Sequence, residues 1–177
     1  MFTKNFRRVV VCQTNAISGY NLALQTRDSS TYTAYNPSGV NLSFITNIVA
    51  NKLSELEGSG SNSGKATFAL GTGSTVNVND YTLDNLISDT DFRVDAASRI
   101  NPANQGLNNK CILQQTITYN GSTPITINEI GLFFIAGNGS AILTAHTSKD
   151  ELDGNGNPIF TPITVEQGDT FIVAMEI

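Results

Sequence analysis

The last third of the chain alternates between apolar and polar positions. Stretches 112–119, 141–147 and 170–177 alternate with a period of two, whereas 128–135 is almost wholly apolar. Alternation indicates strands with one buried face, and a short apolar run indicates a strand that is buried on both faces. Turns rich in glycine and asparagine separate these stretches. The pattern therefore predicts a mainly β chain folded as an antiparallel, jelly-roll-like β-sandwich.

The turn residues also predict how some of these strands are connected. The dipeptide Asn120-Gly121 favours a hairpin that joins 112–119 to 125–130. A second turn, at 153–158, combines Asp, Gly, Asn and Pro, which dominate exposed turns. We expect both turns at the surface, where loops carry contacts to other molecules.

Helical spacing is confined to the N-terminal half, where the pattern predicts one to three short helices. Apolar residues fall on one helical face over 43–57, and a glycine follows directly as a stop signal. An initial strand at 40–45 is the alternative there. A second short helix is expected at 81–87, capped by Asn79 or Asp80.

The remaining N-terminal segments give weaker signals. Leu22 and Leu24 alternate with polar residues and predict one short strand, followed by a loop over 28–39. Residues 65–70 read as a strand. The stretch 93–109 has no firm periodicity, so no element is predicted in it.

Composition places the chain among ordered, single-domain proteins. Of its 177 residues, 40% are hydrophobic and 14% charged, which excludes the charge-rich class of disordered chains. The formal net charge of −5 argues against a general nucleic-acid binder, which needs a basic surface. No stretch reaches the ~20 apolar residues of a membrane span, and no signal peptide is recognised. We expect a segment over 1–14, a single domain over 15–177, and no membrane partner.

The first residues combine aromatic and basic side chains at helical spacing. Phe2 and Phe6 are interspersed with Lys4, Arg7 and Arg8, which indicates a short amphipathic helix. A helix of this kind suits an acidic or apolar groove. These five residues are therefore the predicted partner-docking site.

Two stretches of the sequence resemble phosphate-binding or metal-binding motifs, but each lacks residues that the motif requires. The run Gly-Thr-Gly-Ser at 71–74 lacks the spacing and the lysine of a phosphate loop, so a tight turn is expected. Residues 151–156 partly imitate a calcium loop, but Pro162 stands where its bidentate acid belongs. Cys12 and Cys111 match no metal or redox motif and are expected to be reduced thiols, although a disulfide between them stays open. No cofactor or metal site is predicted.

Glu129 and Gly131 interrupt the apolar run 128–135. Burying an acid is costly unless it is paired or hydrogen-bonded. Two interpretations stay open: a solvated residue at the strand entry, or an acid that pairs with an arginine or with backbone N–H groups and fixes the register. Gly131 indicates a close approach or a bulge. His146, the only histidine, lies in the alternating stretch 141–147, so a partly buried or interfacial strand position is expected.

Two motifs resemble structural proteins of tailed bacteriophages. The first is a strand that ends in Gly-Thr-Gly, at Gly71 and Gly73, followed by Asp-Tyr-x-Leu from Asp80. The second is an Ile-x-Glu-Ile-Gly-Leu-Phe strand that contains Glu129 and Gly131. The end of the chain is similar to the closing strand pair of these proteins, and its first six residues are similar to the start of some gut-phage virion proteins.

The resemblance covers residues 65–90 and 112–177 together with the first few residues. It implies a virion component with a β-sandwich fold, on the head, the collar or the tail, and it implies no catalytic residue and no cofactor. The protein is therefore expected not to be an enzyme. The residues implied to define the fold are Gly71, Gly73, Asp80, Glu129 and Gly131.

The same resemblance implies the partners and the location. The partners would be other phage structural proteins of the capsid, the portal-neck region or the tail, with the chain itself a homo-oligomer in a symmetric assembly. The chain would be made in the bacterial cytoplasm and end in the virion. The alternative is a receptor- or carbohydrate-binding module of a phage fibre, against which the absence of tryptophan weighs.

Overall fold

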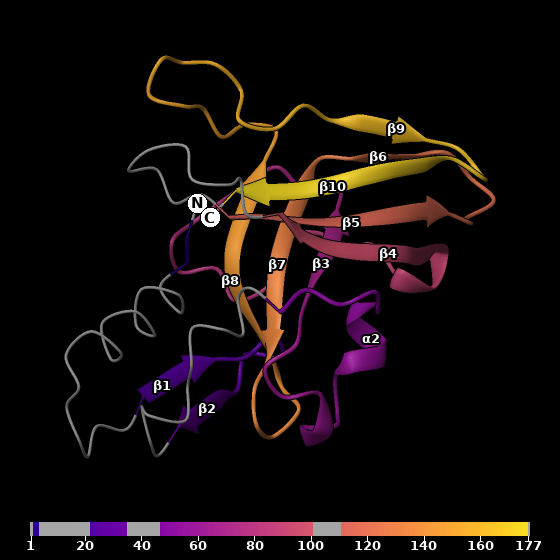
Figure 1. The fold of residues 1–177 in the computed structure, drawn as a ribbon. Helices are drawn as coiled ribbons and strands as arrows, with labels where there is room; N and C mark the ends of the chain where they lie inside the picture. The colour runs from indigo at the N-terminus through magenta and orange to yellow at the C-terminus, as the bar shows by residue number, and fades with distance from the viewer. Residues whose placement is uncertain (1, 4–21, 35–46, 101–110, 177) are drawn as a thin grey trace.

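The computed structural model describes residues 2–3, 22–34, 47–100 and 111–176, and this part of the chain is mainly β (Figure 1). Its strands pair in antiparallel fashion within four sheets. The strands are β1 (Leu22–Gln25), β2 (Thr31–Ala34), β3 (Ala66–Gly71), β4 (Phe92–Ile100), β5 (Ile112–Tyr119), β6 (Ile125–Ile127), β7 (Glu129–Ile135), β8 (Ala141–Ser148), β9 (Ile163–Val165) and β10 (Thr170–Glu176).

Two three-stranded sheets form the body of the described part. One has the order β3-β7-β8 and the other β10-β5-β4, and Figure 1 shows their strands running in different directions. The other two sheets of the described part are two-stranded and consist of β1-β2 and β6-β9. Side chains from both three-stranded sheets, among them Phe68, Leu132, Ile117 and Val173, share one hydrophobic core. Burial of this apolar surface is the main force that holds the sheets together.

β7 is buried along its whole length, as the apolar run predicts. Leu132 and Phe134 face the shared core. Phe133 and Ile135 face a second core, which the short helix α2 (Leu53–Leu56) covers. A strand that contributes to two cores cannot alternate with polar residues, which explains the pattern at this position.

The predicted hairpin between 112–119 and 125–130 is wrong. β5 is the central strand of its sheet, and β4 and β10 occupy both of its edges. The chain therefore leads from the Asn120 turn into β6, which pairs with β9 instead. Asn128 then separates β6 from β7, because its backbone N–H donates to the carbonyl of Gly71 (2.9 Å) and its side-chain amide donates to the carbonyl of Thr72 (2.9 Å).

The helix predicted over 43–57 is confirmed only at Leu53–Leu56, and the rest of its described part is wrong. Only Leu53–Leu56 are α-helical, and this is the one α-helix among the described residues. Ahead of it the chain is extended, and Ile48 forms a bridge with Ala66. Ile48 packs against the shared core and Val49 against the second core, so consecutive apolar residues face opposite ways, as in a strand. The alternative strand at 40–45 lies outside the described residues.

The helix predicted at 81–87 is also wrong. The backbone N–H groups of Asp84 and Asn85 donate to the carboxylate of Glu129, and that of Ile87 donates to Leu70. Leu86 forms a bridge with Gly71. Because these N–H groups bind partners outside the segment, they cannot form the i to i−4 bonds of a helix.

Two strands were not predicted. β4 lies in the stretch that has no clear periodicity, and its register with β5 shifts between Val94 and Ala96. The extra residue at Asp95 is a bulge, which moves the inward-facing positions by one and hides the alternation. β2 lies within the predicted loop over 28–39 and pairs with β1.

The start of the chain pairs with the edge of β8. Phe2 forms a bridge with Ala145, and the hydroxyl of buried Thr3 donates to the carbonyl of Leu143 (2.8 Å). These two residues are therefore extended and not part of a helix. The other predicted docking residues, Lys4, Phe6, Arg7 and Arg8, lie outside the described residues. Over the described ranges, no helix is long and apolar enough to cross a membrane.

Candidate functional site

Glu129, at the start of β7, is fully buried, and its carboxylate is enclosed by hydrogen-bond donors. Oε1 accepts from the backbone N–H groups of Gly73 (2.9 Å) and Asn85 (2.7 Å). Oε2 accepts from the backbone N–H of Asp84 (2.9 Å) and lies 2.8 Å from Nε2 of His146. The second interpretation from the sequence is thus confirmed for the backbone partners, and the cationic partner is a histidine, not an arginine.

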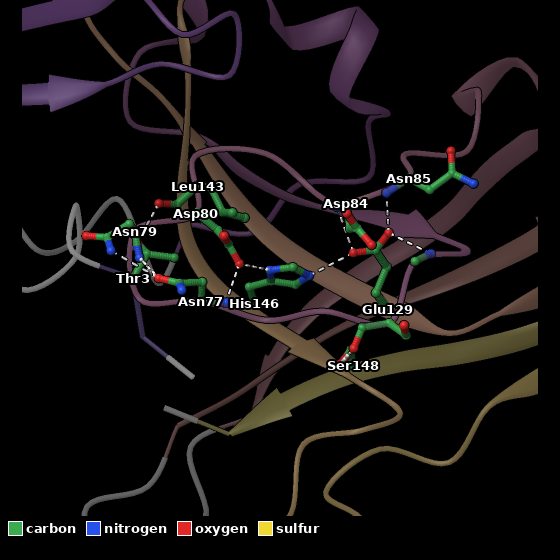
Figure 2. A network of polar contacts seen from close by, with 12 residues as sticks. Thr3, Asn77, Asn79, Asp80, Asp84, Asn85, Glu129, Leu143, His146 and Ser148 are labelled. Carbon is green, nitrogen blue, oxygen red and sulfur yellow. Dashed lines mark hydrogen bonds and ion pairs between the residues drawn. The ribbon is translucent and has the colours of Figure 1, made fainter.

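His146 lies on β8 and is 1% exposed, so its ring is enclosed as well. Its Nδ1 atom lies 2.9 Å from Oδ2 of Asp80, and Nε2 contacts Glu129 (Figure 2). Ionised carboxylates only accept hydrogen bonds, so both ring nitrogens donate. The geometry therefore fits an imidazolium held between two carboxylates.

The pKa values of the pair shift in the direction that keeps both groups charged. Burial lowers the pKa of His146, but the hydrogen bonds and charges of Glu129 and Asp80 outweigh burial and raise it overall. Burial likewise raises the pKa of Glu129, but His146 and the three backbone N–H groups outweigh it and lower it overall. Donors fixed around a charge compensate for its lost hydration, so burial is tolerated here.

The Gly-Thr-Gly run of the sequence encloses this carboxylate. A Cβ atom on Gly71 would lie 2.2 Å from Oε1 of Glu129, and one on Gly73 would lie 2.6 Å from the same atom. Only glycine permits the backbone to approach so closely. The run is therefore a turn built around the acid of the following motif, and it is not a phosphate loop.

Gly131 lies two residues after Glu129 on β7 and is needed for close packing. A Cβ atom there would lie 2.7 Å from a methyl carbon of Leu83 and 2.9 Å from one of Leu143. The neighbouring β8 contains a bulge at Thr144, whose hydroxyl donates to the carbonyl of Leu132 (2.8 Å). Of the two predicted alternatives for Gly131, the close approach is confirmed, and the bulge lies on the partner strand and not at Gly131.

Asp80 joins the network from the segment that follows β3. Its Oδ2 atom also accepts from the backbone N–H of Asn77 (2.6 Å), which closes a short turn. Its side chain is 25% exposed, so it is the member of the network nearest to solvent. The structure thus brings together four of the five predicted fold-defining residues, Gly71, Gly73, Asp80 and Glu129, with Gly131 packed on the same face of β7.

The network is built to hold segments together, since its donors and acceptors are engaged with one another. Neither of two cavities, one of about 310 Å³ and one of about 360 Å³, is lined by Glu129, His146 or Asp80. General acid–base chemistry requires that the group reach a substrate atom. The arrangement fixes the 72–88 segment to the β7–β8 pair.

The other candidate sites are accounted for by local structure. Asp153 accepts from the backbone N–H groups of Asn155 (2.8 Å) and Asn157 (2.9 Å), so the imitation of a calcium loop is a surface turn. These backbone donors lower the pKa of Asp153. Within the part of the chain that the structure describes, no three His, Cys, Asp or Glu residues are placed to hold a metal ion. Cys111 is a free, half-buried thiol, and Cys12 lies outside the described residues.

Sequence reasoning missed the buried polar residue Gln115, whose side chain is 0% exposed. Its side-chain amide donates to the carbonyl of Val49 (2.6 Å) and to the hydroxyl of Thr67 (2.9 Å), and its carbonyl accepts from the backbone N–H of Phe68 (3.2 Å). Because glutamine is polar, its presence in an alternating strand predicts an exposed position. The alternation of β5, however, places Gln115 on the apolar face, and this spacing could have identified it as buried. The pairing of Asp80 with His146 had no signal in the spacing.

Comparison with known proteins gives no relative: no protein family, no curated protein and no solved structure matches this chain.

Proposed function

We propose that this chain is a structural component of a bacteriophage virion, which acts by protein–protein contacts on the head, the collar or the tail. One observation carries the proposal. The two motifs that resemble phage structural proteins meet in space, where Glu129 of one accepts hydrogen bonds from Gly73 and from the segment that contains Asp80. The resemblance thus rests on residues that build one unit of the fold.

The shape of the described part supports the same proposal. We infer that the two three-stranded sheets form an open sandwich around their shared core. None of the described strands pairs with the outer edge of β10. On that strand Ile172 is 62% exposed. A strand edge that no described strand covers and an exposed apolar side chain are features that a neighbouring subunit can contact, and the partners would be other phage structural proteins and further copies of this chain.

The direct test is to count copies of the chain in purified particles of the phage that encodes it, by quantitative mass spectrometry. The proposal expects a fixed, stoichiometric number. Hundreds of copies would indicate the shell, and about a dozen would indicate a ring of the neck or tail. Absence from particles, with the protein abundant in infected cells, would overturn the proposal.

The predicted docking segment can be tested separately. Removal of residues 1–12 is expected to abolish incorporation into particles, because Phe2, Phe6 and three basic residues would be lost together. A variant that replaces only Lys4, Arg7 and Arg8 by serine separates charge from folding. Unchanged incorporation of both variants would show that the segment does not dock.

A further inference from the structure

A cavity of about 310 Å³ lies at one end of the shared core, next to helix α2. Phe68 and Leu70 of β3, Val94 of β4 and Ile117 of β5 are among its apolar walls. Phe92 lines it too, and that ring is held by contacts with Tyr119 and Phe171, at centroid distances of 5.3 and 6.5 Å. The walls thus come from several elements and are fixed by packing that exists without a ligand.

Charged and polar groups surround the apolar walls, and two of them, Arg27 and Glu57, form an ion pair. The guanidinium of Arg27 donates two hydrogen bonds to Glu57, and the side-chain hydrogen bond to Glu57 leads the causes that raise the pKa of Arg27. The carboxylate of Asp89 accepts from the backbone N–H of Ser54 (2.7 Å). Lys52 also lines the cavity, so two cations and two anions surround it and their formal charges cancel.

We propose that this cavity is a binding site for a small, neutral, largely apolar molecule about the size of two fused aromatic rings. The volume lies at the lower end of the roughly 300–1,000 Å³ of small-molecule pockets. A charged ligand would have to compete with the Arg27–Glu57 ion pair at the rim, whereas a neutral one loses no hydration energy of this kind. Walls on several sides fit a compact molecule, while a strand or helix of a partner needs an open groove.

The probe for the test is 2-naphthol, which is neutral at pH 7, with 2-naphthoate as its charged counterpart. Calorimetric titration of the full chain is expected to show saturable binding of 2-naphthol, and at least about tenfold weaker binding of 2-naphthoate. Methyl NMR signals of Leu70, Val94 and Ile117 should shift with the probe, which locates it without any substitution. Equal affinity for the two probes, or the absence of saturable binding, would overturn the proposal.

A matched pair of substitutions on β4 gives the second arm. Val94→Trp places a large side chain in the cavity and is expected to weaken 2-naphthol binding by about tenfold or more. Ala96→Trp adds the same side chain on the opposite face of the same strand and should leave binding unchanged, because Ala96 pairs with Thr116 beyond the bulge and does not line the cavity. Should Val94→Trp fail to fold, Val94→Phe is the smaller replacement. Binding that survives in folded Val94 variants would contradict the site.

Discussion

At the scale of single residues, the fold is organised around the carboxylate of Glu129, which is fully buried and whose surroundings favour the charged form. Glu129 has four donors around its two oxygens, and one of them, His146, is held by a second acid. Buried ion pairs contribute little net stability compared with an apolar replacement, but removal of one partner leaves the rest uncompensated. The residues are therefore costly to change one at a time.

Replacement of Glu129 by Gln tests this cost. The side chain keeps its size, but it loses the charge that balances His146 and brings an N–H₂ group among N–H donors. We expect a loss of about 2 to 4 kcal/mol in the free energy of unfolding, measured by urea denaturation. Glu166→Gln removes the same charge at an exposed position of the β9–β10 turn and should change stability by no more than about 0.5 kcal/mol. Equal effects of the two substitutions would refute the role of Glu129.

The glycine before this acid can be tested with a matched control. Gly71→Ala places a methyl group 2.2 Å from Oε1 of Glu129, and four hydrogen bonds hold the carboxylate of Glu129 in place. Overpacking of this kind costs about 1 to 3 kcal/mol. Gly154→Ala adds the same methyl group where nothing lies within 4 Å, and it should be close to neutral. Thermal unfolding of both variants compares them, and a neutral Gly71→Ala would contradict the close approach.

At the scale of elements, the sequence predicted two kinds of strand, those with one buried face and those that are buried on both faces. β5 and β10 are of the first kind, whereas β8 is buried along most of its length, and β7 was recognisable from its unbroken apolar run. The failures have a common physical cause, because long-range partners overrode local patterns. The segment 81–87 has helical spacing but forms no helix, because backbone N–H groups within it donate to Glu129 instead. The alternation of β4 was hidden by its bulge.

The candidate site was predictable in part. The glycines, Asp80 and Glu129 could be singled out as fold-defining, since an acid and glycines in such positions need a special reason. Their mutual contacts were not predictable, because they join segments more than forty residues apart, with a sequence separation of 45 from Asp84 to Glu129 and of 66 from Asp80 to His146.

The link between the two three-stranded sheets gives a prediction at the same scale. Gln115 of β5 binds Val49, Thr67 and Phe68, so it ties one sheet to the other and to the extended segment before α2. Gln115→Leu leaves these buried polar groups without that partner, and we expect a loss of about 1 to 3 kcal/mol in chemical denaturation. Gln114→Leu, one position along on the opposite face of β5, should cost less than about 0.5 kcal/mol. A larger loss of stability for Gln114→Leu than for Gln115→Leu would show that Gln115 does not connect the two sheets.

At the scale of the whole molecule, the network joins the centre of the fold to its periphery. β7 contributes to both cores and β8 pairs with it, while the 72–88 segment is held to this pair through Glu129, His146 and Asp80. A scaffold that neighbours grip must keep its loops in place. We infer that the charged network serves this purpose, in keeping with the proposed role in a virion.

The charges make the stability of the whole molecule depend on pH in a defined direction. The pKa of His146 is raised on folding, so its contribution is complete below its ordinary value of 6.5 and is lost as pH rises through the raised value. The pKa of Glu129 is lowered, so its contribution is present above its ordinary value of 4.5 and is lost as pH falls through the lowered value. The stabilisation by the pair is therefore greatest at pH values between the lowered pKa of Glu129 and the raised pKa of His146.

The most direct test is the free energy of unfolding of the wild type and of His146→Gln, measured by urea denaturation from about pH 5 to about pH 9. Because His146 is the only histidine, no other imidazole contributes to the difference between the two profiles. We predict that the advantage of the wild type is largest at the acidic end and shrinks as pH rises beyond 6.5. Two parallel profiles, or a stability advantage of the wild type that grows with pH, would contradict a buried imidazolium that stabilises the fold.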